Sequence, residues 1–293
     1  MNKNISIVII HTGYQDYLKH NLEITGINNH IYLIGDQSIK HLEQINNVTF
    51  INIEKYRNLD LIKKCKVHFK NYSSNSPEFE WLCFERVFII KHFLIDYKLN
   101  QIFHIDSDNI LLMNINNYEF KKEIAYCLNK NFHKFRMSHS IHSGLLNINF
   151  CDKFIELYQD IYINKTKLYL IQDKINYHTD NNSNKFINGG ICDMTLYYLL
   201  VKEKILDVQN LLEPNQNTVF INNINNGEGY NNKEQYITLN NLLKINLQPD
   251  SITINDKHYN KSYNINNIHF QGISKHLLNN NFSSCIKKII NYN

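Results

Sequence analysis

The sequence predicts an α/β fold with a mostly parallel central sheet. Apolar runs alternate with amphipathic stretches over the first 110 residues, a pattern typical of strands joined by crossover helices. Polar clusters follow three of the apolar runs, at residues 11–13 (HTG), 35–37 (GDQ) and 106–108 (DSD). Ligands bind outside the carboxyl ends of the strands in such sheets, so these clusters predict one shared crevice.

The N-terminal elements follow from the spacing of their apolar residues. The run ISIVIIH (5–11) is continuously apolar, which predicts a strand buried on both faces. Residues 17–28 (YLKHNLEITGIN) place apolar residues at helical spacing, and we expect Gly26 to cap this helix. A second buried strand, a helical segment and another strand are then expected at 30–37 (HIYLIGDQ), 39–45 (IKHLEQI) and 48–53 (VTFINI).

The rest of the chain begins regularly and becomes less so. Residues 79–99 form the longest amphipathic stretch, and they lead into another buried strand at 101–106 (QIFHID). In the second half we expect a strand at 144–149, helices at 151–163 and 191–204, and several short strands. No internal repeat or Pro/Ser-rich linker divides the chain, so a single domain with an elaborated C-terminal half is expected.

Composition narrows the class of protein. The chain is 43% hydrophobic and 20% charged, as in ordinary globular proteins. Its 31 basic and 27 acidic residues leave an excess too small to predict nucleic-acid or membrane-surface binding. No stretch has the roughly 18 apolar residues needed to span a bilayer, and no signal peptide is evident. Six cysteines without CxxC spacing predict reduced thiols, hence a cytoplasmic protein, or one of the host cytoplasm or virion if viral.

The pair Asp106 and Asp108 is the most informative local feature. Residues i and i+2 of an extended chain point to the same face, so the two carboxylates project together while Ser107 turns away. Such a pair repels itself unless a cation lies nearby, and oxygen ligands favour Mg²⁺ or Mn²⁺. Two aspartates capping a turn would be the simpler alternative. The apolar runs on either side (IFHI and NILL) predict a tight strand–turn–strand, which favours the metal site.

Four segments together resemble a known family. HIDSDNILL resembles the DxD motif of GT-A fold glycosyltransferases, which hold a nucleotide-sugar diphosphate through Mn²⁺ or Mg²⁺. FERVFIIKHFL resembles the preceding helix in bacterial, algal and giant-virus members. FINGGICDMTLYYLL (186–200) is similar to their acceptor-side Gly-Gly segment and helix, and NIHFQGISK (267–275) to the late His-x-x-Gly-x-x-Lys element of glycogenin-like enzymes. The resemblance covers nearly the whole chain and implies a GT-A (Rossmann-like) fold, with a nucleotide-binding half at 1–115 and an acceptor-binding half at 116–293.

The resemblance also implies roles for single residues. His269 would be the third protein ligand of the metal, and its nitrogen would favour Mn²⁺ over Mg²⁺. Gly272 would let the backbone approach a diphosphate, and Lys275 would donate to the diphosphate oxygens during catalysis. A histidine satisfied in the core and a solvated lysine are the simpler alternatives. The implied donor-binding residues are His11, Thr12, Gly13, Asp36, Arg86, Ser107, Gly189, Gly190, Gly272 and Lys275.

Several of these residues have structural alternatives. Asp36 could be only a turn former after a strand. Arg86 could bind phosphate in its guanidinium fork or form a structural salt bridge. Gly189 and Gly190 would open the N-terminus of the next helix to a ligand. Asp193 in its first turn would orient the sugar, activate the acceptor, or simply complement the helix dipole.

The expected reaction is metal-dependent transfer of a sugar, such as a hexosyl or N-acetylhexosaminyl group, from a nucleotide-sugar, expected to be a UDP-sugar, to a hydroxyl of a glycan or glycoprotein. If the anomeric centre inverts, Asp193 is the candidate base; if it is retained, front-face attack needs none. A haloacid-dehalogenase-type phosphatase also uses DxD, but its motif lies near the start of the domain and continues to Thr or Val where this chain has Ile110. A non-catalytic sugar-nucleotide-binding relative is the other alternative. The sequence makes no prediction of oligomeric state.

Overall fold

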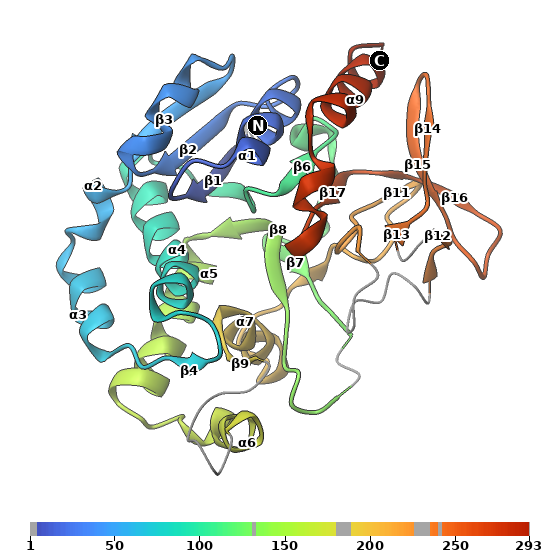
Figure 1. Ribbon diagram of the computed structural model, residues 1–293. Coiled ribbons are helices and arrows are strands. Elements are labelled where there is room, and N and C mark those ends of the chain that lie inside the picture. The colour runs from blue at the N-terminus through green and yellow to red at the C-terminus, as the bar shows by residue number, and fades with distance from the viewer. Residues whose placement is uncertain (1–4, 131–132, 180–188, 226–234, 240–241, 293) are drawn as a thin grey trace.

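A seven-stranded mixed sheet forms the centre of the computed structural model, which describes residues 5–130, 133–179, 189–225, 235–239 and 242–292. Four of its six neighbouring strand pairs are parallel, and β8 runs antiparallel to both of its neighbours. The expected α/β class and mostly parallel sheet are therefore confirmed (Figure 1). From one edge to the other, the strands are β10 (Gln209–Asn210), β7 (Ala125–Cys127), β8 (Ser140–Asn147), β5 (Gln101–Ile105), β1 (Ser6–His11), β2 (Ile31–Gly35) and β3 (Val48–Asn52).

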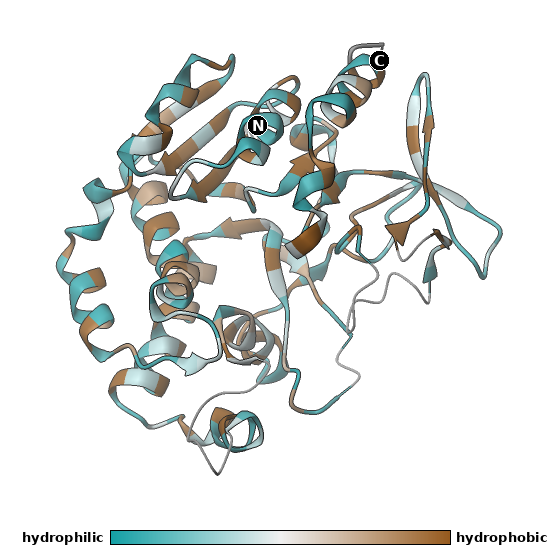
Figure 2. Ribbon diagram, viewed as in Figure 1, coloured by the Kyte–Doolittle hydropathy of each residue, from teal (hydrophilic) through white to brown (hydrophobic). Residues whose placement is uncertain are grey.

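Both faces of the sheet are covered, as the continuous apolar runs predict. In β1, Val8 and Ile10 pack into one core and Ile7 and Ile9 into the other. Helices on the first side are α4 (Pro77–Asp96), α5 (Ile148–Tyr158) and α7 (Asp193–Lys202). The second side is covered by α1 (Asp16–Thr25), the 3₁₀ helix η1 (Gln37–Gln44) and the segment around η2 (Ile115–Asn117). Figure 2 shows the apolar strands enclosed by these elements.

Helix ends agree with the sequence except in detail. Gly26 does occupy the C-cap of α1, but in a right-handed conformation (φ −69°), and a Cβ there would lie 2.6 Å from the Leu22 carbonyl oxygen. The segment expected to be helical at 39–45 is a 3₁₀ helix that begins after Asp36, whose carboxylate accepts from the Ser38 amide. The long helix α4 begins two residues earlier than expected, because the Ser76 hydroxyl caps it and Pro77 occupies its first turn.

The remaining elements extend the second half of the chain. A four-stranded sheet in the order β11-β16-β15-β14 lies beside the central sheet (Figure 1). Of three two-stranded pairs, β4-β9 and β6-β17 join segments distant in sequence, whereas β12-β13 joins neighbouring segments. No helix among the described residues is long and apolar enough to cross a membrane. The strands are β4 (Tyr72–Ser73), β6 (Asn109–Leu111), β9 (Gly190–Ile191), β11 (Thr218–Val219), β12 (Thr238–Leu239), β13 (Leu242–Leu243), β14 (Ile245–Gln248), β15 (Ser251–Asn255), β16 (Ser262–Ile265) and β17 (Asn267–His269). The helices are α2 (Glu54–Arg57), α3 (Asp60–His68), the π-helix η3 (Gln159–Ile163), α6 (Tyr169–His178), the 3₁₀ helix η4 (Gly272–Leu277) and α9 (Asn280–Tyr292).

Candidate metal and donor site

The two aspartates lie in a tight turn between β5 and β6, as expected. The Asn109 amide donates to the Asp106 carbonyl oxygen (3.0 Å), which closes the turn. Strand β17 then pairs antiparallel with β6 so that His269 lies opposite Asn109, and the Phe270 amide donates to the Asp108 carbonyl oxygen (2.8 Å). This register brings the late histidine beside the mid-chain carboxylates.

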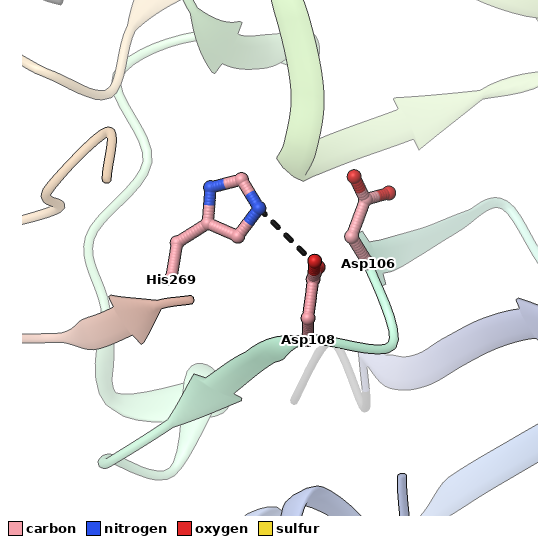
Figure 3. A group of neighbouring side chains, drawn as sticks. All are labelled: Asp106, Asp108 and His269. Carbon is pink, nitrogen blue, oxygen red and sulfur yellow. Dashed lines mark ion pairs between the residues drawn. The ribbon is translucent and has the colours of Figure 1, made fainter. Parts of the chain in front are cut away.

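The side chains of Asp106, Asp108 and His269 converge (Figure 3). One ligand atom from each lies within 4.8 Å of the other two. His269 Nε2 is 3.3 Å from Asp108 Oδ1, and its Nδ1 is 2.6 Å from the Asn222 carbonyl oxygen. Because a carbonyl oxygen can only accept, Nδ1 carries a hydrogen and a neutral His269 presents the lone pair of Nε2 to the aspartates. Two carboxylates and one imidazole nitrogen so arranged fit a divalent cation.

Electrostatics favour the charged forms of this cluster. Burial acts to raise the pKa of Asp106, but the Arg86 guanidinium and nearby imidazoles outweigh it and hold that pKa below its usual range. Burial likewise opposes ionisation of Asp108, whose pKa is lowered by His269 and Lys275. Burial would lower the pKa of His269, yet Asp108 raises it above the ordinary value. Both aspartates are therefore anionic acceptors at neutral pH.

Lys275 contacts the other oxygen of the Asp108 carboxylate. Its Nζ lies 3.1 Å from Asp108 Oδ2 and 4.9 Å from the centre of the Tyr17 ring. Burial opposes the charge, but Asp108 and Tyr17 raise the pKa of Lys275. Gly272, the first residue of η4, has φ +64°, where a side chain would be strained although no atom blocks it. The glycine therefore sets the direction of the short helix that carries Lys275.

Arg86 is held by two carboxylates, which changes the expectation that it binds phosphate. Its NH1 lies 2.5 Å from Asp106 Oδ1 and its NH2 2.7 Å from Asp193 Oδ2. Burial opposes the charge, but the two aspartates raise the pKa of Arg86 well above its usual value. Each terminal nitrogen of the guanidinium group thus already has a carboxylate partner. The structural salt bridge, considered above as the alternative, is what the chain forms.

Asp193 is similarly engaged. It is the first residue of α7 and is 3% exposed. Its Oδ2 accepts from the Tyr197 hydroxyl (3.0 Å) as well as from Arg86, and its Oδ1 accepts from the Met194 amide (2.8 Å). A buried carboxylate with all these donors is poorly suited to remove a proton from an acceptor. Asp193 therefore acts on the site through Arg86, and the base role expected for an inverting reaction loses its basis.

Gly189 and Gly190 have a role different from the expected opening of a helix to ligand. Gly190 belongs to β9, which pairs with β4, and its φ is +134°. A Cβ on Gly190 would lie 2.1 Å from the Tyr72 carbonyl oxygen. Gly189 exchanges hydrogen bonds with Ser74, through its amide (3.0 Å) and its carbonyl (2.9 Å). Both glycines therefore serve close backbone pairing; Asn188 lies outside the described residues.

The cluster after β1 lies beside the predicted metal site. The Gly13 amide donates to Asp36 Oδ2 (2.7 Å), so the ends of β1 and β2 are linked as expected. Burial acts to raise the pKa of Asp36, but donors from Ser38 and Gly13 lower it. Burial lowers the pKa of His11, and the charges of Lys275 and Asp108 also act on this histidine. Its Nε2 is buried without a hydrogen-bond partner, so a neutral imidazole nitrogen faces the interior here. Thr12 is half-buried beside it.

No protein-family model and no curated protein sequence matches the chain. Among solved structures, the chain is similar to mouse xyloside xylosyltransferase 1 at 13% identity and a TM-score of 0.47, covering 71% of this chain and 84% of that one. It is similar to the PaToxG glycosyltransferase at 16% identity and a TM-score of 0.37, covering 70% and 71%. A cytidylyltransferase from Leptospira borgpetersenii gives 9% identity and a TM-score of 0.32, covering 69% and 95%. Overlaps at this level do not establish an activity, which rests instead on the residues of this chain.

Several residues that support the site were not expected from the sequence. Asn109 donates to Ser143 Oγ (2.8 Å) and accepts from Asn267 (2.8 Å), so the turn, β8 and β17 are joined by buried side chains. The Ser143 hydroxyl is thus occupied in holding Asn109. The ring of His142 stacks on His269, with centroids 4.3 Å apart and planes at 15°. The one feature of the sequence that could have indicated these supporting residues is the occurrence of polar residues within apolar segments.

Proposed function

We propose that this chain is a glycosyltransferase that moves a sugar from a nucleotide-sugar donor, expected to be a UDP-sugar, to a hydroxyl of a glycan or glycoprotein. The carrying observation is the convergence of Asp106, Asp108 and His269 with Lys275 beside them. The two aspartates and the His269–Lys275 pair come from segments far apart in the sequence. The hydrogen bond between Asn109 and Asn267, which are 158 residues apart, joins these two segments. Residues 1–115 would supply most of the nucleotide site, and the 116–293 half would complete it with His269 and Lys275. We further propose a cytoplasmic location.

The proposed roles follow from position and charge. Asp106, Asp108 and His269 Nε2 would hold Mn²⁺ or Mg²⁺, which when bound supplies positive charge to a diphosphate. The Lys275 ammonium lies within reach of the same carboxylate and would turn to the leaving nucleotide as that group gains negative charge. Asp36, Gly13 and His11 at the ends of the first two strands would bind the base and ribose. The donor roles of Thr12 and Ser107 rest on the family resemblance alone.

The surroundings of Asp193 support a retaining reaction. Inversion requires a carboxylate free to accept the acceptor proton, whereas Asp193 is bonded to Arg86, Tyr197 and the Met194 amide. A front-face attack, in which the leaving phosphate oxygen takes the proton, needs no such residue. NMR of the first-formed product would distinguish the two anomers.

Binding of UDP with and without Mn²⁺ tests the proposal directly. We expect titration calorimetry to show UDP binding that depends on Mn²⁺, and Asp108→Asn to abolish it. Asp207→Asn is the matched control, because Asp207 lies on the surface with its side chain 87% exposed. Donor hydrolysis should follow the same pattern, first screened with UDP-glucose, UDP-galactose, UDP-xylose, UDP-N-acetylglucosamine and GDP-mannose. Full activity of Asp108→Asn, or metal-independent UDP binding, would refute the assignment.

A further inference from the structure

Helix α1 carries a row of polar side chains on a face turned toward the aspartate turn. Tyr17, Asn21 and Thr25 follow one another at four-residue spacing, which places them on one side of the helix. Asn29 continues the spacing beyond the helix end. Asn21 and Thr25 are fully buried, and Asn29 is 6% exposed. Buried polar groups are retained only when hydrogen-bonded, so their partners indicate what the row does.

Asn21 binds the turn that holds the two aspartates. Its Nδ2 lies 3.3 Å from the Asp106 carbonyl oxygen, 2.9 Å from that of Ser107 and 3.1 Å from that of Asn109. One side-chain amide thus reaches three of the four carbonyl groups of residues 106–109. The Asp106 carbonyl oxygen also accepts from the Asn109 amide, so loss of Asn21 would affect chiefly the carbonyl groups of Ser107 and Asn109.

The orientation of Asn21 is fixed by its neighbour. The Leu111 amide donates to Thr25 Oγ1 (3.0 Å), and the Thr25 hydroxyl donates to Asn21 Oδ1 (2.8 Å). Because the oxygen of Asn21 already accepts from Thr25, its amide nitrogen must face the carbonyl groups of the turn. The row therefore acts as a template of donors and acceptors for the main chain from Asp106 to Leu111.

We infer that Asn21 is a positioning residue for metal binding, an inference that rests on the proposed function. Asp106 and Asp108 carry like charges and repel each other, so a turn that is not tethered can open and separate their carboxylates. Asn21 joins the backbone on both sides of Asp108 to a rigid helix, which limits that separation. The same row holds Lys275, since the Tyr17 ring lies under its ammonium group.

Asn29 supplies a matched control within the same row. It donates to the Met113 carbonyl oxygen (2.9 Å) and accepts from the Ile115 amide (3.0 Å), so it ties the same segment to α1, beyond the aspartates. Asn21→Ala and Asn29→Ala remove the same atoms from two buried sites. Both should lower the melting temperature, because both leave backbone groups without partners.

The experiment measures Mn²⁺ dissociation constants by electron paramagnetic resonance for the full chain and each variant. We expect Asn21→Ala to weaken Mn²⁺ binding about tenfold, as loss of groups behind metal ligands commonly does, and Asn29→Ala to leave it within about twofold. If Asn21→Ala does not fold, the near-isosteric Thr25→Val, which removes the hydroxyl that orients Asn21, should weaken binding in the same direction. Unchanged binding in the folded Asn21 or Thr25 variant, or equal weakening by Asn29→Ala, overturns the inference. Absence of Mn²⁺ binding in the wild-type chain instead overturns the proposed function, and the inference with it.

Discussion

Replacing Arg86 with methionine tests whether one guanidinium balances two buried carboxylates. Methionine keeps much of the volume of the side chain but leaves Asp106 and Asp193 without their shared partner. The side chain of Asp193 is 4% exposed and that of Asp106 26%, so neither charge is fully rehydrated after the change. We expect a loss of folding stability and a weaker metal site together.

The magnitude follows from the burial of the two acids. Removing one partner of a buried ion pair costs about 3–5 kcal/mol, since an uncompensated charge remains. We apply that cost to Asp193 alone, because water reaches part of Asp106, and expect a loss of about 4 kcal/mol. For a domain of this size, the corresponding fall in melting temperature is about 8–16 °C.

Urea unfolding of a double-mutant cycle isolates the interaction. Asp193→Asn alone should cost about 1–2 kcal/mol, because Arg86 keeps Asp106 and the amide still accepts one hydrogen bond. In the double variant no charge is left at residue 193, so it should be at least about 2 kcal/mol more stable than the sum of the single changes predicts. Arg57→Met is the control, because it removes the ion-pair partner of the buried Glu85 carboxylate away from the site.

The expected contrast is that Arg57→Met lowers stability without changing Mn²⁺ affinity, whereas Arg86→Met changes both. Single costs that add to within about 0.5 kcal/mol in the double variant would mean that the two charges are not coupled. The Arg86 bridge would then be incidental to the fold, and the positioning role assigned to Asp193 would have no basis.

Three further predictions concern pH, charge and backbone packing. Protons compete with a metal for His269 Nε2, and Asp108 raises the pKa of His269 against the effect of burial. Mn²⁺ affinity should therefore fall about tenfold per pH unit below that raised pKa. A flat profile of Mn²⁺ affinity between about pH 5.5 and 8 would exclude His269 as a ligand. Lys275→Met should weaken UDP binding in saturating Mn²⁺. It should not weaken binding of Mn²⁺ alone, because it removes a cation that competes with the metal for Asp108. If calorimetry gives the variant the same UDP affinity as the wild-type chain, the proposed contact with the diphosphate is contradicted. Gly190→Ala should lower the melting temperature sharply, because the new Cβ would lie 2.1 Å from the Tyr72 carbonyl oxygen and because the φ of this residue disfavours alanine. Gly13→Ala is the control and should lower the melting temperature less, since Gly13 also has a positive φ but no atom lies near its added Cβ.

The strands and the aspartate turn could be predicted because local sequence decides them. Apolar residues in β1 occur on both faces, so burial on both sides follows without knowledge of its neighbours. The turn at 106–108 is likewise set by two apolar runs around three polar residues. His269 was identified by resemblance to a family element, and its position beside Asp108 depends on the register of β17 against β6.

Local sequence patterns could not predict which side chains from remote segments contact one another. Arg86 lies in the helical run FERVFIIKHFL, which predicts a helix but not that its side chain spans Asp106 and Asp193. The glycines before α7 suggested an open helix end, whereas Gly190 is required by the neighbouring strand β4. In both cases the deciding contact comes from a segment remote in sequence.

By itself, the sequence determined an α/β sheet, the acidic turn at one strand end and the candidate ligands for a cation, because hydrophobic period and residue chemistry are properties of short segments. The tertiary structure alone decided which groups face one another: His269 toward Asp108, Arg86 between two acids, and Asn21 beneath the turn. These arrangements arise from the packing of α1, α4 and β17 around the turn, where most buried polar groups form hydrogen bonds.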